Sequence, residues 1–423
     1  MTIAWPLRPL GELAEFRNGI NYTKSSFGTG MKVIGVKDFQ DHTTPRYLDL
    51  EEIDPSGIVT ERDHLRDGDI LFVRSNGNRE LIGRNLYIHE PEETITHSAF
   101  TIRVRLQPGL FPRFYAYLLR TPIVRATLTA HGGGTNISNL NQGILARLLV
   151  PVPPLETQRR LAKMCAAYDE LIDNNRRRSW LLEALARAIH REWFTAGENL
   201  RSASGAEPLL DGWGRVPLRD CIEINPKVAK VAVPREGEKP FVAMGSLSND
   251  SMIVGGFELR IGNSGSKFQN GDTLFARITP SLENGKTGFV QFLPDARSVA
   301  FGSTEFIVLR SKTLTPELVY LLSRTDEFRG TAIKSMAGAS GRQRVQERCF
   351  DSMTVVQPSA EILARFTEVV RPMFRLVQEL HLQNLNLRVT RDLLLPRLLS
   401  GQLSLAKSEG DPAILGEASA ALV

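Results

Sequence analysis

Polar side chains follow the same short motif at two places in this chain. The motif is Gly-Asp-x-Leu-Phe-x-Arg, and it ends at Arg74 and again at Arg277. Arginine, asparagine, glutamine, serine and threonine can hydrogen-bond to base edges, and arginine and lysine also neutralise phosphates. The motif is shared while the residues after it differ, as expected if one scaffold reads two different things. The alternative is that these are ordinary solvated loops.

Each copy also carries a second polar stretch near its end, at 135–139 and at 340–344. We therefore select two sets of candidate DNA-binding residues, one for each copy. In the first copy they are Arg74, Ser75, Asn76, Arg79, Asn136 and Ser138. In the second copy they are Arg277, Thr279, Ser281, Lys286, Arg342, Gln343 and Arg344.

Signatures of catalysis are incomplete. Gly285-Lys286-Thr287 resembles the end of a phosphate-binding loop, but Pro280 stands where that loop needs glycine, and the residues that follow read as a strand. The seven histidines and three cysteines show no metal-ligand spacing. The motifs of amino-methyltransferases and the GxSxG nucleophile elbow are missing. An enzyme acting on DNA remains one alternative, and a structural adaptor that binds protein is another.

The elements that must position these loops occur twice. Gly68 and Gly271 lie 203 residues apart in matching motifs, and Pro112 and Pro316, which each open a predicted helix, lie 204 apart. Each copy contains short β-type runs bounded by turns, then a Pro-flanked strand and a long helix. The sequence therefore predicts an α+β fold with a tandem pseudo-repeat, in which two mixed α/β domains are separated by two long antiparallel helices.

The long helices carry apolar residues at a 3.5-residue repeat. We expect these residues to pack the helices on each other as a spacer of ~60 Å, from roughly forty residues at ~1.5 Å each. The alternative is that each helix caps its own domain. Pro372 predicts a kink or a restart of the second helix, and Pro396 and Gly401 its end. The seam residues are Leu161, Tyr168, Ile172, Leu182, Ile189, Phe366, Val370, Val377, Leu387 and Leu394.

Composition restricts the classes of protein to which the chain can belong. The 423 residues are 42% hydrophobic and carry a formal net charge of +5, so most of the chain can build cores. We expect no membrane span, no secretion signal, and a cytoplasmic protein with reduced thiols. The predicted divisions are a first mixed α/β domain at 1–154, a first helix at 155–195, a linker at 196–214, a second mixed α/β domain at 215–358, a second helix at 359–403, and a tail at 404–423.

The chain resembles the specificity subunit of type I restriction–modification systems. The resemblance covers about Trp5 to Leu403. Its most specific segments are LFARITPS at 274–281, ENGK at 283–286, SGRQRV at 340–345, PPLETQRR at 153–160 and RDLLLPRLLSG at 391–401.

The resemblance implies two target-recognition domains that each read one half of a split double-stranded DNA sequence, held apart by the helices. It implies two modification subunits that methylate adenine, motor–nuclease subunits, and no catalysis or cofactor in this chain. S-adenosylmethionine, ATP and magnesium would belong to the partners. Two departures stand out: Pro358-Ser359-Ala360-Glu361 lacks the Leu-Glu-x-Gln pattern of the first helix, and the first domain lacks the Ile-Thr-Pro-Ser segment.

Overall fold

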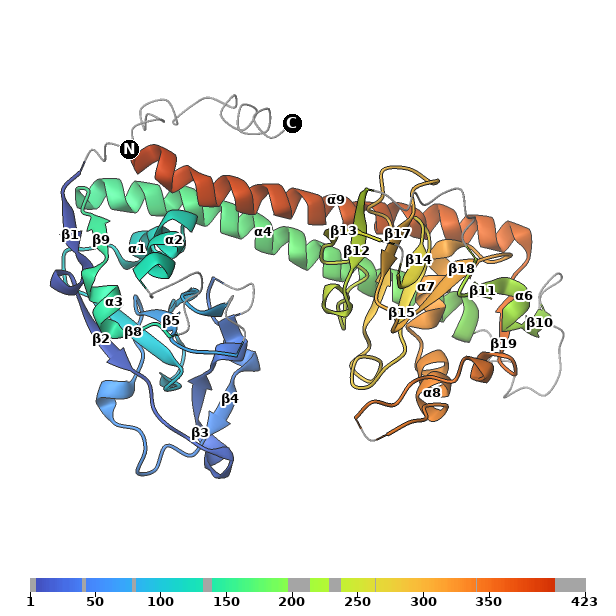
Figure 1. Cartoon of the computed structure of the whole chain (residues 1–423), viewed down its shortest axis with the longest axis horizontal. Coiled ribbons are helices and arrows are strands. Elements are labelled where there is room, and N and C mark those ends of the chain that lie inside the picture. The colour runs from blue at the N-terminus through green and yellow to red at the C-terminus, as the bar shows by residue number, and fades with distance from the viewer. Residues whose placement is uncertain are drawn as a thin grey trace. The chain divides into compact units, whose positions relative to one another are not determined.

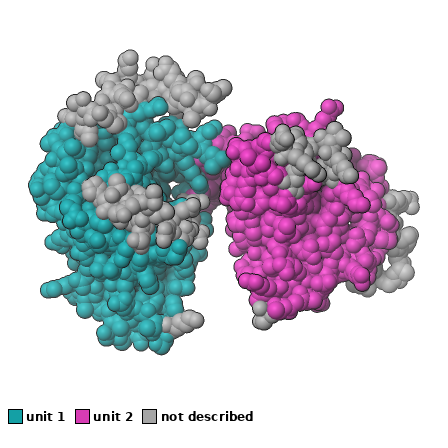
Figure 2. Space-filling view, in the orientation of Figure 1, with its two compact units in different colours: residues 1–173, 385–423 teal, residues 174–384 magenta. Residues whose placement is uncertain are grey.

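The fold is given by a computed structural model that divides the chain into two compact units. Unit 1 comprises residues 1–173 and 385–423, and unit 2 comprises residues 174–384 (Figure 2). The described residues are 5–39, 43–77, 81–131, 139–196, 214–227, 237–262, 264–339 and 341–399. Outside them lie the candidates Arg79, Asn136 and Ser138, residues 197–213 of the predicted linker, and the predicted tail.

Unit 1 is built on two small sheets and a two-stranded ribbon. One antiparallel sheet has the order β2-β8-β5-β6, from β2 (Ala14–Asn18), β8 (Thr101–Leu106), β5 (Ile70–Val73) and β6 (Asn85–Tyr87). A second sheet has the order β4-β3-β7, from β4 (Glu51–Ile53), β3 (Phe27–Ile34) and β7 (Ile95–His97), with β3 and β7 parallel. A two-stranded ribbon joins β1 (Leu7–Pro9) to β9 (Leu149–Pro151). The helices are α1 (Pro112–Leu118), α2 (Pro122–His131) and α3 (Gln142–Arg147).

Unit 2 repeats this arrangement of two sheets and a ribbon (Figure 1), but its second sheet has four strands instead of three. The first sheet has the order β11-β18-β15-β16, from β11 (Ile222–Ile224), β18 (Phe306–Ser311), β15 (Thr273–Ala276) and β16 (Thr287–Phe289). The second has the order β13-β12-β17-β14, from β13 (Glu258–Ile261), β12 (Glu238–Val242), β17 (Ala300–Gly302) and β14 (Ser266–Phe268). The ribbon pairs β10 (Gly214–Pro217) with β19 (Thr354–Gln357), and the helices are α6 (Leu218–Cys221), α7 (Pro316–Ser323) and α8 (Asp326–Lys334). The tandem repeat predicted from the sequence is therefore confirmed.

The Gly-Asp pair of the shared motif serves the fold rather than the site. Gly68 and Gly271 both have φ of 88°, a left-handed conformation that glycine adopts without strain. The next residue is buried in each case, and Arg105 on β8 donates to both carboxylate oxygens of Asp69 at 2.7 Å. Arg310 on β18 does the same for Asp272, at 2.7 and 2.6 Å. Each pair ties the start of a central strand to its neighbour.

Two long helices contribute to both units. They are α4 (Leu155–His190), which continues as a π-helical turn over Arg191–Ala196, and α9 (Ala360–Leu399). In unit 2 they run antiparallel, because Asn175 donates to Asn384 at 3.1 Å while the rings of Phe194 and Phe366 lie 5.0 Å apart. In unit 1, the core includes Leu161 and Cys165 of α4 together with Leu394 and Leu398 of α9.

The proline effects expected in the second helix are weaker than predicted. No restart occurs at Pro372, and α9 continues past Pro396 to Leu399. Proline costs a helix one backbone hydrogen bond, but Val370 and Phe374 on either side of Pro372 are buried in the core of unit 2, and Leu395 and Leu398 are buried in unit 1. Packing along the apolar seam therefore holds the helix together.

No helix in the described parts of the chain is long and apolar enough to cross a membrane.

Candidate nucleic-acid interface

Two loops of unit 2 that carry candidate residues are hydrogen-bonded to each other. Thr279 N donates to Gln343 O at 3.1 Å, and Gln343 N donates back to Thr279 Oγ1 at 3.1 Å. Val345 N donates to Arg277 O at 2.8 Å. The structure thus brings four candidates together, Arg277, Thr279, Gln343 and Arg344, although more than sixty residues separate the two loops in the sequence.

The side chain of Arg277 is engaged inside this cluster. Its Nη2 donates to Val345 O at 3.2 Å, and its Nη1 lies 3.1 Å from Glu347 Oε1. The side chain is only 25% exposed, so little of it reaches the surface. Arg277 therefore holds the segment around Val345 and Glu347 in place, and its guanidinium would have to leave these partners before it could contact a base.

Arg344 is placed very differently. Its side chain is 49% exposed and makes a two-point contact with Glu305, from Nε at 2.9 Å and from Nη2 at 2.6 Å. The Arg344 guanidinium holds the pKa of the Glu305 carboxyl below its usual range. Nη1 of Arg344 has no hydrogen-bond partner within the described residues, and Arg342 nearby is also exposed. A planar guanidinium fixed along one edge is well suited to bidentate recognition of a base or a phosphate.

The turn at 280–286 is braced from behind. Asn284 N donates to Pro280 O at 2.9 Å, and Lys286 N donates to Ser281 O at 3.0 Å. Arg324 donates to Gly285 O at 2.7 Å, and Lys286 Nζ donates to Met244 O at 3.1 Å. Lys286 therefore uses one of its three donors within the unit, while Ser281 is partly exposed on the turn.

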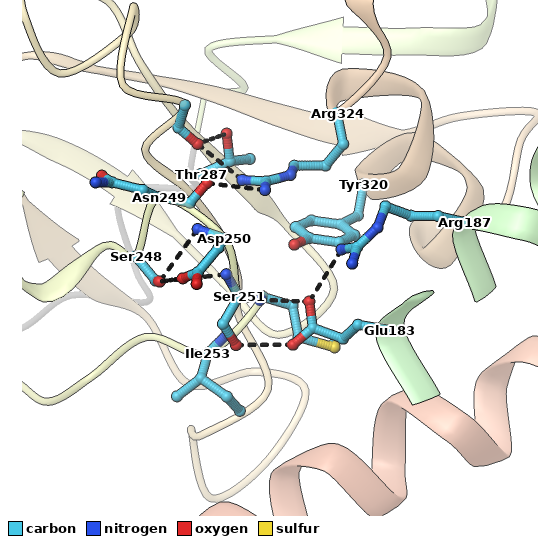
Figure 3. Close-up of polar contacts among 12 residues, drawn as sticks. Glu183, Arg187, Ser248, Asn249, Asp250, Ser251, Ile253, Thr287, Tyr320 and Arg324 are labelled. Carbon is cyan, nitrogen blue, oxygen red and sulfur yellow. Dashed lines mark hydrogen bonds and ion pairs between the residues drawn. The ribbon is translucent and has the colours of Figure 1, made fainter. Parts of the chain in front are cut away.

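A buried carboxylate on α4 supports this turn through a neighbouring loop (Figure 3). Glu183 is 4% exposed, accepts from Ser251 Oγ at 2.7 Å and from Met252 N at 3.0 Å, and lies 3.6 Å from Arg187. Burial raises the pKa of Glu183. The loop also binds the turn, because Thr287 N donates to Ser248 O at 3.2 Å. Sequence reasoning missed Glu183, since a glutamate on a charged helix is usually solvated.

Unit 1 presents the same backbone framework at its candidate loop. Arg74 N donates to Phe100 O at 2.8 Å, and Leu140 N donates to Arg74 O at 2.8 Å. The counterparts in unit 2 are Arg277 N to Glu305 O at 3.0 Å and Val345 N to Arg277 O. Ser75 and Asn76 follow directly and are partly exposed. The equivalence of the two motif arginines, expected from the sequence, therefore extends to their backbone hydrogen bonds.

Within the described residues, no group of three histidine, cysteine or acidic side chains could hold a metal ion.

The seam residues predicted on the long helices face the interior of the units. Buried seam residues are Leu161, Ile172, Phe366, Val370, Val377 and Leu394. Partly buried ones are Tyr168, Leu182, Ile189 and Leu387. A partner protein would therefore contact other faces of the helices.

Comparisons with known proteins show that the chain is similar to the specificity subunits of type I restriction enzymes. Residues 3–184 match the model of a family described as the type I restriction modification DNA specificity domain. The chain is 21% identical over 446 residues to the type I restriction enzyme EcoKI specificity subunit of Escherichia coli strain K12, covering 99% of this chain and 93% of that protein. It is 22% identical over 316 residues to the MjaIX specificity subunit of Methanocaldococcus jannaschii, covering 70% of each.

The solved structures that match the chain include two crystal structures. The specificity subunit from M. genitalium gives a TM-score of 0.49 at 14% identity, covering 94% of this chain and 96% of that one. The HsdS subunit from Thermoanaerobacter tengcongensis gives a TM-score of 0.35 at 17% identity, covering 94% and 97%.

Proposed function

We propose that this chain, which is similar to the specificity subunits of type I restriction–modification systems, reads a bipartite double-stranded DNA target and catalyses nothing itself. Unit 1 reads one half of the target and unit 2 reads the other. The long helices set the unread gap between the halves. The recognition domains of this proposal are residues 1–154 and 215–358. In the sequence, the first long helix and the linker lie between the two domains, and the second long helix follows the second domain.

One observation carries the proposal. The same framework of two backbone bonds recurs in both units around Arg74 and Arg277, while the exposed residues on it differ. A fold needs only the framework, so different exposed residues on identical frameworks are expected when two different sequences are read. Arg344 and Arg342 in unit 2, and Ser75 and Asn76 in unit 1, are exposed or partly exposed donors at these places. Such donors suit base edges and phosphates.

The partners follow from this role. A subunit that only recognises DNA needs separate subunits for chemistry, so we assign methylation to two modification subunits and cleavage to motor–nuclease subunits. S-adenosylmethionine, ATP and magnesium would then be bound by those partners, and the complex would act on DNA in the cytoplasm. The seam side chains are engaged within the units, so the outward faces of α4 and α9 are the surface available to the modification subunits.

The test compares two arginines that each bind a glutamate at the surface of unit 2. The chain is produced with its modification subunits, and methylated sites are mapped on genomic DNA. We expect methylation at a split sequence, and Arg344→Ala to weaken or relax one half-site by ~1–3 kcal/mol while the other half is unchanged. Arg260→Ala is the matched control, because Arg260 binds Glu258 with a similar exposure of 47%.

Three results would contradict the proposal. The first is methyl transfer by the purified chain without any partner, which would make it an enzyme. The second is failure of the assembled complex to bind DNA, which would favour an adaptor for proteins. The third is an identical methylation pattern for wild type and Arg344→Ala, which would remove Arg344 from the recognition site.

A further inference from the structure

An exposed phenylalanine lies on the framework of unit 1. Phe100 is 61% exposed, although large apolar side chains are usually covered. It is part of a turn in which Thr101 N donates to Ser98 O at 2.9 Å, between β7 and β8. Its carbonyl oxygen accepts from Arg74 N at 2.8 Å. The phenyl ring is therefore carried by a rigid turn that is bonded directly to the motif arginine.

The same turn occurs in unit 2 with a different residue at this position. There Phe306 N donates to Ser303 O at 3.2 Å, and Arg277 N donates to Glu305 O at 3.0 Å. Glu305 is thus the counterpart of Phe100. Its carboxylate fixes the exposed guanidinium of Arg344 through two hydrogen bonds. One position of the shared scaffold therefore carries a polar, arginine-orienting residue in unit 2 and an exposed aromatic ring in unit 1.

We propose that Phe100 contacts DNA, making an apolar contact with a base in the half-site that unit 1 reads. This inference rests on the proposed function and adds a residue to it. Phenylalanine is one of the side chains that pack on the 5-methyl group of thymine in the major groove, and apolar side chains can also wedge between base steps. Both modes use the same chemistry, an apolar ring against a base, and they are distinguishable by experiment.

The surroundings of Phe100 favour DNA over a protein partner. Ser75 and Asn76, which follow Arg74, and Asn139, which precedes Leu140, are polar and at least partly exposed. A surface for a protein partner is generally apolar at its centre, whereas Phe100 stands among polar side chains on the framework that positions Arg344 in unit 2. An apolar ring among hydrogen-bonding groups matches base readout, which combines both kinds of contact.

The experiment uses the chain assembled with its modification subunits and a duplex that contains its methylated target. Thymines of the unit 1 half-site are replaced one at a time by uracil, which lacks the 5-methyl group. We expect wild type to lose about tenfold in affinity at one such thymine. Phe100→Ala should lose a similar factor on the unaltered duplex and nothing more on that uracil duplex. Phe100→Leu should retain part of the affinity. Leu48→Ala, which removes a side chain that is 92% exposed in the same unit, should match wild type.

If the phenyl ring instead inserts between two base steps as a wedge, the binding results differ from those above but still support the contact. In that case no uracil duplex is weakened, and 2-aminopurine placed in the half-site becomes fluorescent with wild type but not with Phe100→Ala. The contact is overturned if Phe100→Ala binds and methylates the target like wild type. It is also overturned if the variant weakens unrelated DNA equally, or if it fails to assemble with the modification subunits while its thermal unfolding is unchanged.

These outcomes separate this inference from the proposed function. If the wild-type complex recognises no split sequence, the proposed function fails. If wild type recognises one and Phe100→Ala is indistinguishable from it, only the role of Phe100 fails.

Discussion

At the scale of residues, the shared motif divides into parts that serve the fold and parts that reach the surface. Asp69 and Asp272 are buried and each binds an arginine on the neighbouring strand at two points. Arg277 is likewise bound within unit 2, to Val345 and Glu347. Arg344, which lies outside the motif, has the more accessible guanidinium. Repetition of the motif therefore leads to loops that carry exposed donors, whereas the motif's own residues mainly support those loops.

The buried aspartates predict a clear stability effect. Asp272→Asn removes the charge that Arg310 binds at 2.6–2.7 Å, and leaves a partly buried guanidinium without its carboxylate. We expect a loss of about 1–3 kcal/mol in the free energy of unfolding. Thermal unfolding measures it. Glu12→Gln is the control, because Glu12 binds Arg8 at a site where both side chains are about half exposed, and it should change stability by less than about 1 kcal/mol. Equal effects of the two variants would refute the structural role of Asp272.

A buried histidine predicts a dependence on pH. His97 is fully buried in unit 1, its Nδ1 lies 2.9 Å from Thr101 Oγ1, and its Nε2 has no partner among the described residues. Burial lowers the pKa of His97 to about 3. Below its ordinary pKa of about 6.5, the unfolded chain takes up a proton that the folded chain does not accept until about pH 3. The contribution of His97 to stability is therefore complete above pH 6.5 and declines as the pH falls toward 3.

Thermal unfolding at pH 7.5 and pH 5 tests this dependence. At pH 5 the wild type should have lost about 2 kcal/mol through His97, and His97→Gln should show correspondingly less pH dependence. Glu305, whose pKa is lowered, also loses its contribution at acidic pH, but it does so in both proteins. An equal dependence on pH in wild type and in His97→Gln would mean that His97 is protonated without penalty.

The residues that sequence reasoning missed share a physical cause. Glu305 and Phe100 occupy equivalent turns, but they are unrelated residue types, so a comparison of the two sequence copies does not match them. Only the backbone bonds show that their positions are equivalent. Glu183 likewise reads as one charged residue among many on a helix. Arg344 could be selected in advance because it lies in a polar stretch that recurs at a constant offset. Patterns in a sequence find repeated loops, whereas the partner of each side chain depends on packing.

At the scale of elements, the sequence predicted the helices and strands well because their patterns are local. The seam of apolar residues lies toward the interior in both long helices, and the buried apolar runs at 70–73 and 306–309 form strand β5 and most of β18. The prolines were harder to judge. A proline rule describes an isolated helix, whereas α9 is packed on both sides of Pro372 by residues far away in the chain. Tertiary packing therefore determines that α9 stays helical across Pro372.

The opening of the first long helix has a role within unit 1. Gln158 is buried, its Oε1 accepts from Phe111 N at 2.9 Å, and its Nε2 donates to Pro153 O at 2.7 Å. The Leu-Glu-x-Gln pattern, which the second helix lacks, therefore joins α4 to the residue that precedes α1. The difference between the two helices is at least partly a difference in internal bonding.

Replacing Gln158 measures this contribution. Gln158→Leu keeps the approximate volume but leaves the amide of Phe111 and the carbonyl of Pro153 without partners, so we expect a loss of about 1–3 kcal/mol in unfolding free energy. Glu156→Gln, at an exposed position of the same turn, should have little effect. If Gln158→Leu is as stable as wild type yet no longer assembles with the modification subunits, the pattern serves partner binding instead.

At the scale of the whole molecule, the antiparallel helices predict how the DNA target would respond to their length. An insertion near Arg177 falls where α4 is uninterrupted. Because α4 pairs with α9, an insertion in one helix alone would move its seam residues away from their partners. We therefore insert seven helix-forming residues in each helix, after Arg177 and after Leu382, which preserves the 3.5-residue seam. Asn175 and Asn384 then remain opposite each other.

Seven residues lengthen a helix by ~10 Å, which corresponds to about three base pairs. The methylated sequence should therefore keep both half-sites and gain about three base pairs in its gap, because the residues that contact bases are unchanged. Mapping methylated sites with the modification subunits present measures this directly. Insertion in α4 alone is the control, and it should lower thermal stability. A longer helix pair that leaves the gap unaltered would show that the helices do not set the spacing, and altered half-sites would show that they help to read the sequence.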